Sequence, residues 1–388
     1  MKPNFIYMDH AATTPADPRV VEAMRPFFTD RFANPATLYT QGRENDDAVE
    51  ASRESIARNL NCASSEIYFT SGGTESDNWA IKGAVWAGEK RGRHIVTSAV
   101  EHHAVLDTCE YLAAHGGELT VVPVSSQGMV DPADVAKAIR DDTVLVSIMH
   151  ANNEVGAIEP IEEISAITRE KGVLFHTDAV QTVGKIPVDV EALGVDILSA
   201  SGHKFYGPKG VGFLYIRKGT RVETLNHGGG QERSRRSGTL NVPGIVGMAA
   251  ALDLAGESID SADRLSAMAR RLWDGLTAKA GDLNLNTDLS NCLPGFLNFV
   301  VAGVEGEAML LRLDNADICV SSGSACTTGS LEPSHVLLAL GLPPEVAHGS
   351  LRFTMGRENT DADIDAILEV LPGIITTLRE MSPTYRKT

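Results

Sequence analysis

The stretch VLFHTDAVQTVGKIPVDVEALGVDILSASGHK, residues 173–204, decides the fold. It contains two short apolar runs, residues 173–176 and 197–199, which have the length and composition of buried β-strands. Polar residues follow each run, with Asp178 after the first and Lys204 after the second. Ligands of open α/β sheets bind just beyond the carboxyl ends of the strands. The stretch therefore predicts both a sheet and a binding site at its edge.

Similar apolar runs occur on both sides of this stretch and alternate with segments of helical character. Residues 161–171 have the pattern of a helix between two strands. This alternation predicts a mostly parallel, seven-stranded sheet with helices on its faces. The predicted strands are residues 67–69, 94–98, 119–124, 143–149, 173–176, 197–199 and 211–216.

The C-terminal third of the chain has a different pattern. Apolar residues recur at helical spacing over residues 265–276 and again over residues 364–371. We therefore expect a large domain at residues 16–255 and a smaller α/β domain formed by residues 1–15 and 256–388.

Composition limits the classes of function. The 388 residues include 51 acidic and 34 basic side chains, a net charge of −17, which argues against a broad nucleic-acid surface. The first residues lack an apolar signal core, and no uncharged apolar run has the length of a bilayer span. The five cysteines are scattered without a Cys-x-x-Cys pair, as is typical of a reducing compartment and not of a zinc site. We expect a cytoplasmic protein with no membrane segment and no metal.

Lys204 and Asp178 together suit pyridoxal 5′-phosphate. This cofactor needs a lysine for its Schiff base and a carboxylate opposite its ring nitrogen. A lone lysine is usually a surface charge, and an aspartate after a strand is often only a turn former. The small neighbours of Lys204 and the strand before it favour a buried, functional lysine.

Two further patterns fit the same cofactor. Residues 69–76 form a glycine-containing turn after a strand, and the helix N-terminus that follows would suit a phosphate. The alternative is an ordinary turn capped by Thr74. His102 follows another strand and could stack on a ring or move protons, although a structural histidine would give the same pattern.

Cys326 lies among small and polar residues in the segment 320–330. Such a segment packs poorly but allows a thiolate to react, so Cys326 is a candidate nucleophile. A serine-rich turn with an exposed cysteine is the structural alternative.

With these patterns assembled, the chain resembles the cysteine desulfurases, class V aminotransferase-like enzymes of the fold-type-I pyridoxal-phosphate class. It is most similar to the branch with an extended cysteine loop that serves iron-sulfur cluster assembly. The matching motifs are residues 9–15, 71–76, 101–105, 150–156, 178–181, 201–210, 228–233, 236–239, 322–326, 332–337 and 351–353.

The resemblance implies a role for each site residue. Lys204 would hold the cofactor, Asp178 would pair with the ring nitrogen, and Gln181 would contact the ring hydroxyl. His102 would lie against the ring, and Asn153 and Arg352 would receive the substrate carboxylate, with Asn153 also beside the cofactor. The residues expected around the phosphate are Gly73, Thr74, Ser201, His203 and, from the partner subunit of a homodimer, Thr239.

The implied reaction converts L-cysteine to L-alanine and leaves the sulfur on Cys326 as a persulfide. The sulfur would pass to an iron-sulfur scaffold protein, and Cys326 could transiently ligate a cluster. Alternatives are a selenocysteine lyase, an aminotransferase on the same fold, and a sulfur-relay subunit of low activity. Tyr39 stands where many family members have a histidine, which puts any role of that histidine in doubt here.

Overall fold

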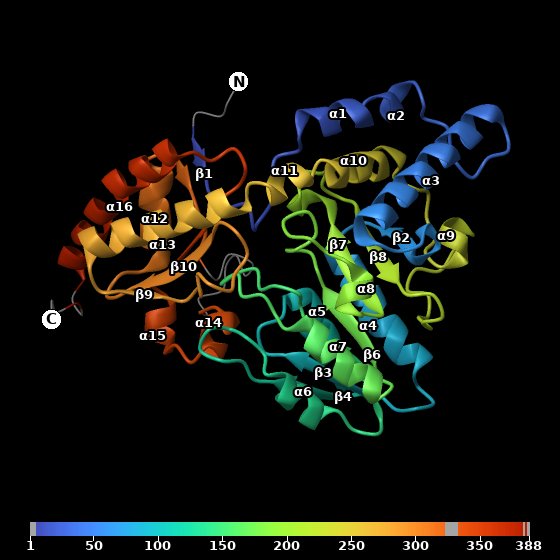
Figure 1. Cartoon of the computed structure of the whole chain (residues 1–388), viewed down its shortest axis with the longest axis horizontal. Helices are drawn as coiled ribbons and strands as arrows, with labels where there is room; N and C mark the ends of the chain where they lie inside the picture. Colours follow the sequence, from blue (N-terminus) through green and yellow to red (C-terminus); the bar gives the residue numbers. More distant parts are fainter. Residues whose placement is uncertain (1–4, 323–332, 383–384, 386–388) are drawn as a thin grey trace.

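The computed structural model describes residues 5–322, 333–382 and 385, and its largest element is a seven-stranded sheet (Figure 1). The strand order is β2-β8-β7-β6-β5-β3-β4. β8 is antiparallel to both its neighbours, and the other adjacent pairs are parallel. The mostly parallel seven-stranded architecture is thus confirmed. The strands are β2 (Ile67–Thr70), β3 (His94–Ser98), β4 (Glu118–Val122), β5 (Thr143–Ser147), β6 (Leu174–Asp178), β7 (Ile197–Ser201) and β8 (Gly212–Ile216).

Helices cover both faces of this sheet. Side chains alternate along a strand, so Leu145 and Ile197 pack on one face while Val146 and Leu198 pack on the other. Burial on both faces explains why the strands read as continuous apolar runs. One face contacts α4 (Gly73–Ala87) and α5 (His103–Ala114); the core of the other includes α3 (Thr40–Leu60), α7 (Ile161–Glu170) and α10 (Val242–Asp253).

A second structural unit contains an antiparallel sheet of order β12-β10-β9. Its strands are β9 (Leu283–Leu285), β10 (Phe296–Val301) and β12 (Ser350–Thr354), and α12 (Ala262–Ala280) and α16 (Asp361–Met381) pack against them. The start of the chain joins this unit, because β1 (Ile6–Tyr7) pairs with β11 (Ile318–Cys319). The exact domain boundaries at residues 16 and 256 stay a prediction.

The remaining helices are short and connect these layers. They are α1 (Pro18–Met24), α2 (Pro26–Thr29), α6 (Pro132–Ala138), α8 (Val190–Leu193), α9 (Gln231–Ser234), α11 (Gly256–Ile259), α13 (Gly306–Asp314), α14 (His335–Ala339) and α15 (Pro344–Ala347).

One stretch of the described residues, Val242–Ile259, is long and apolar enough to cross a membrane by length and composition alone, but 56% of it is buried inside the protein. It also contains Asp253 and Glu257, and buried core helices pass the same test.

Candidate active site

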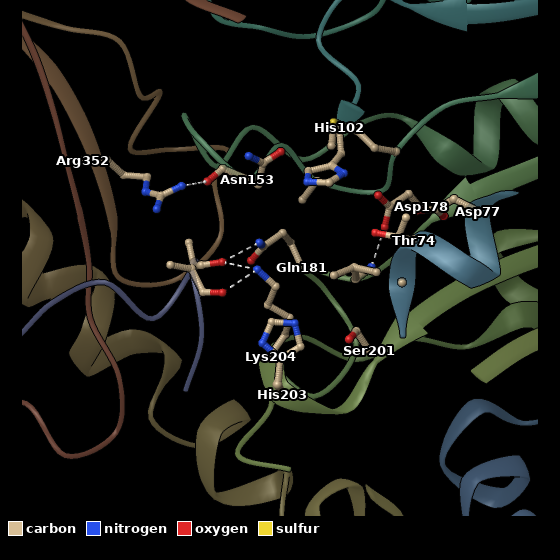
Figure 2. A pocket seen from close by; sticks show the side chains of 16 residues that line it. Thr74, Asp77, His102, Asn153, Asp178, Gln181, Ser201, His203, Lys204 and Arg352 are labelled. Carbon is tan, nitrogen blue, oxygen red and sulfur yellow. Dashed lines mark hydrogen bonds between the residues drawn. The ribbon is translucent and has the colours of Figure 1, made fainter. Parts of the chain in front are cut away.

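A cavity of about 290 Å³ lies at the carboxyl ends of the parallel strands, where the second unit meets the large sheet (Figure 2). Most of the predicted site residues line it. Thr239 is exposed and is not among the lining residues, and Cys326 lies outside the described residues. The predicted residues that line the cavity are Gly73, Thr74, His102, Asn153, Asp178, Gln181, Ser201, His203, Lys204 and Arg352.

Lys204 reaches the cavity because β7 ends at Ser201 and the chain then makes a single 3₁₀ turn, Gly202–Lys204. Its Nζ donates to the carbonyl oxygens of Ala11 and Ala12, at 2.5 and 2.9 Å. These carbonyls come from the N-terminal segment, which crosses to the second unit. The lysine is therefore held at the cavity wall by neutral acceptors, with its amine facing the space where a ligand would bind.

Asp178 is the last residue of β6 and is 5% exposed. Its Oδ1 accepts a hydrogen bond from the Val180 N–H at 2.9 Å. Burial raises the pKa of its carboxyl to about 6, while that hydrogen bond and the charge of Lys204 act in the opposite direction. A cation placed against this carboxyl would favour its ionised form, which is the property a protonated ring nitrogen requires.

Two histidines at the cavity are neutral at physiological pH. His102 Nδ1 accepts from the Ala104 N–H at 3.1 Å at the start of α5. Burial, followed by the charge of Lys204, lowers the pKa of both His102 and His203 to about 4. With Nδ1 of His102 occupied as an acceptor, its ring proton resides on Nε2.

Arg352 brings a cation to the opposite wall from β12. It is 3% exposed; its Nη1 donates to the Asn153 carbonyl oxygen and its Nη2 to Asp9 Oδ1, both at 2.7 Å. Its Nε and the Asn153 Oδ1 atom are buried and, within the described part of the chain, have no hydrogen-bond partner. These two unsatisfied groups suit a small polar ligand, because buried polar atoms are normally paired.

The turn before α4 leaves no room for larger side chains. Gly72 adopts φ +152°, and a Cβ on Gly73 would lie 2.7 Å from Val180 Cγ2, so both positions favour glycine. Gly72 occupies the cap position and α4 begins at Gly73, so the alternative that Thr74 caps the helix is wrong. The helix dipole favours an anion here.

Gln181 is held between two groups, donating to the Ala11 carbonyl oxygen at 2.9 Å and accepting from Lys185 Nζ at 2.8 Å. Sequence reasoning missed Lys185, whose pKa burial lowers well below its usual value, and the pairing of Asp9 with Arg352. It also missed Asp77, a buried residue of α4 that lines the cavity. Helical spacing from Ala80 and Ile81 could have placed Asp77 on the buried face of its helix.

An ammonium group, a buried carboxylate, a guanidinium and an anion seat around one cavity are the groups that pyridoxal phosphate and an amino acid require. The residues present therefore fit this cofactor. Within residues 5–322, 333–382 and 385, no group of three or more His, Cys, Asp or Glu side chains could hold a metal ion.

Fold and site define a class of enzyme. The chain belongs to the aminotransferase class-V family, which matches residues 6–367. Within this family the chain groups with the cysteine desulfurases. It is 53% identical over 379 residues to cysteine desulfurase IscS of Dictyoglomus turgidum, covering 97% of this chain and 96% of that protein.

Solved structures agree with this relationship. A NifS-like protein superposes with a TM-score of 0.91 at 41% identity, covering 96% of this chain and 100% of the other. SspA, solved in complex with cysteine, superposes with a TM-score of 0.81 at 34% identity, covering 92% and 100%. The predicted family, fold and enzyme class are confirmed.

Proposed function

We propose that this enzyme uses pyridoxal 5′-phosphate to convert L-cysteine to L-alanine, with the sulfur retained as a persulfide on Cys326. The observation that carries the proposal is the placement of Lys204, Asp178 and Arg352 around one cavity. When bound, the cofactor supplies an aldehyde that condenses with amines and a ring that accepts the electron pair released at Cα.

Each side chain then has a task that follows from its position. Lys204 Nζ would hold the cofactor, and the same amine would be the base that takes the proton from the substrate Cα. Asp178 would stabilise positive charge at the ring nitrogen. His102 would lie against the ring as a neutral imidazole, with Nε2–H as its ring donor.

Arg352 and Asn153 bind the substrate carboxylate. A guanidinium meets a carboxylate with parallel hydrogen bonds, and the unpaired Nε of Arg352 supplies one of them. The other would come from Nη2, which carries two N–H groups and uses one of them to donate to Asp9 Oδ1. Orientation of the Cα–H bond toward Lys204 follows from this anchor.

The assignment of Cys326 rests on the resemblance and on thiolate chemistry, because the residue lies outside the described part of the chain. A thiolate that attacks the substrate sulfur leaves the carbon skeleton as alanine and forms a persulfide. The physiological acceptor in this proposal is an iron-sulfur scaffold protein in the cytoplasm.

Thr239 is assigned to the cofactor of the partner subunit in a homodimer. Its exposure supports this role, since a residue that serves a partner must reach beyond its own subunit. The nearby Arg236 is fixed by two hydrogen bonds to Glu75, at 2.7 and 2.9 Å, which anchors the segment beside the phosphate seat.

The test is to incubate the protein with cysteine, alkylate it without reductant, and determine the mass of the peptide that contains Cys326. We expect one extra sulfur on that peptide, removable by thiol, and alanine in the solution. Cys326→Ser should bind cysteine but form almost no alanine, because a hydroxyl is a poor nucleophile toward sulfur.

Three results would replace the proposal. Extra sulfur on Cys62, Cys109, Cys292 or Cys319 would assign the nucleophile elsewhere. Alanine formed from selenocysteine but not from cysteine would indicate a selenocysteine lyase, and amino transfer to a keto acid would indicate an aminotransferase.

A further inference from the structure

Lys185 lies in the turn that follows β6, close to the cavity but without a task in the reaction described above. Its backbone N–H donates to the Thr182 carbonyl oxygen at 2.9 Å, which turns the chain back toward Gln181. Its Nζ donates to Gln181 Oε1 at 2.8 Å and lies 5.5 Å from the centre of the Phe296 ring. Gln181 is 4% exposed and Lys185 is partly buried. The lysine is therefore packed inside the protein, with its amine directed at one side-chain amide.

The other end of that amide faces the N-terminal segment. Gln181 Nε2 donates to the Ala11 carbonyl oxygen at 2.9 Å, and the same oxygen accepts from Lys204 Nζ (Figure 2). A carbonyl oxygen can only accept, so the nitrogen of the amide must face Ala11 and its oxygen must face Lys185. The amide nitrogen carries two N–H groups, and Ala11 takes one of them. The second is the group that Gln181 can offer to the cavity, whose wall it forms.

Lys185 favours this orientation of the amide over the reverse. Without its Nζ, the buried Oε1 of Gln181 would lose its donor, and an unpaired buried acceptor costs free energy. A rotation of the amide would then point this oxygen at the cavity. Both the ammonium and the neutral amine of a lysine carry N–H groups. The contact therefore does not depend on the pKa of Lys185, which burial and the charges of Lys204 and Arg352 lower.

We propose that Lys185 is a positioning residue, which holds the Gln181 amide so that an N–H is directed at the ring hydroxyl oxygen of the cofactor. The inference rests on the proposed function and deepens it, since resemblance alone assigned Gln181 to that hydroxyl. A donor stabilises the ionised form of a ring hydroxyl, whereas an amide oxygen in its place would disfavour that form. Lys185 does not touch the ring and acts through Gln181.

Two cofactor analogues separate this role from a general loss of binding. Pyridoxamine 5′-phosphate and 3-deoxypyridoxamine 5′-phosphate differ only in the ring hydroxyl, and neither has an aldehyde that could react with Lys204. Calorimetry measures the Kd of each for the full-length protein freed of cofactor. The wild type should prefer the hydroxyl form about 5- to 10-fold, and Lys185→Met should lose most of this preference. A purely structural change would weaken both ligands equally and leave the preference unchanged.

A double variant shows whether Lys185 acts through Gln181. Gln181→Leu should also lose the preference, and Lys185→Met should change it no further in that background, because the amide is already gone. A direct effect of the lysine on the ligand would persist in the double variant and would overturn the proposal. A wild-type preference in Lys185→Met would overturn it as well.

Lys82 of α4 provides a matched control. Its Nζ also donates to an amide oxygen four residues earlier, Asn78 Oδ1 at 2.7 Å, and lies 5.0 Å from the centre of the Tyr111 ring. Asn78 is not among the described residues that line the cavity. Lys82→Met therefore makes the same change away from the ring hydroxyl and should keep the wild-type preference.

Nitrogen NMR of the Gln181 side-chain amide tests the donor in the wild type itself. The signal is assigned by its absence from Gln181→Leu. Pyridoxamine 5′-phosphate should shift it more than the 3-deoxy analogue does, and equal shifts would overturn the proposal even if Lys185→Met did not fold. If neither analogue bound to the wild type, the proposed function would fail instead.

Discussion

Replacement of Arg352 by glutamine tests the substrate anchor most directly. The side chain is 3% exposed and has two contacts, to the Asn153 carbonyl oxygen and to Asp9. A lost hydrogen bond to a charged ligand group costs about 1.5–3 kcal/mol. At 1.36 kcal/mol per factor of ten, kcat/KM for cysteine should fall about 10- to 150-fold.

The same substitution also affects stability, so a control must separate the two effects. Removal of one partner from a buried ion pair costs about 3–5 kcal/mol. We expect the lower end, because the Asp9 side chain is 18% exposed. The double variant Arg352→Gln/Asp9→Asn should recover part of this stability but none of the lost kcat/KM.

The assay compares alanine formation from cysteine with turnover of cysteamine, which has the same thiol and amine but no carboxylate. The wild type should prefer cysteine strongly, and Arg352→Gln should lose that preference. Asp9→Asn retains the guanidinium and should keep the preference. Wild-type saturation by cysteine in Arg352→Gln would show that the carboxylate binds elsewhere.

Two further predictions concern the base and a buried acid. Lys204→Ala should form no alanine, and borohydride reduction should not attach the cofactor to the protein. The thermal unfolding of this variant should stay close to that of the wild type. Cofactor mass found on another peptide after borohydride reduction would contradict the assignment. Burial raises the pKa of Glu159 to about 8, so the folded state keeps a proton that the unfolded state loses, and stability should fall as pH rises from about 4.5 to 8. Glu159→Gln should flatten that part of the denaturation profile, whereas an identical slope in both proteins would exclude Glu159 as its source.

The large sheet could be predicted because most of its strands, unlike the partly exposed edge strand β4, are buried on both faces. Strand β3 was predicted with its exact bounds, and β5 and β6 within two residues at each end. The sequence predicted a turn that leads into a helix at Gly72 and Gly73, and the structure has one there, but the predicted cap was wrong. Gly72 takes the cap position with φ +152°, a conformation open mainly to glycine, and propensity alone favours Thr74.

Contacts between distant parts of the chain could not be predicted from local pattern. Arg352 and Asp9 are 343 positions apart, and their ion pair depends on how the second unit packs on the first residues. Lys204 Nζ donates to the backbone carbonyl oxygens of Ala11 and Ala12. Every residue has such a carbonyl group, so the identity of these two residues does not predict the contact. Such contacts follow from tertiary structure, which periodicity does not encode.

The side chains that line the cavity come from both structural units. Lys204 and Asp178 follow strands of the large sheet, whereas Arg352 belongs to β12 of the second unit. The N-terminal segment contacts both, since Ala11 accepts from Lys204 and Asp9 accepts from Arg352. Because the proposed base and the proposed carboxylate anchor lie on different units, we infer that this segment sets their separation, and a change in it should misplace the Cα–H bond without altering any group that reacts.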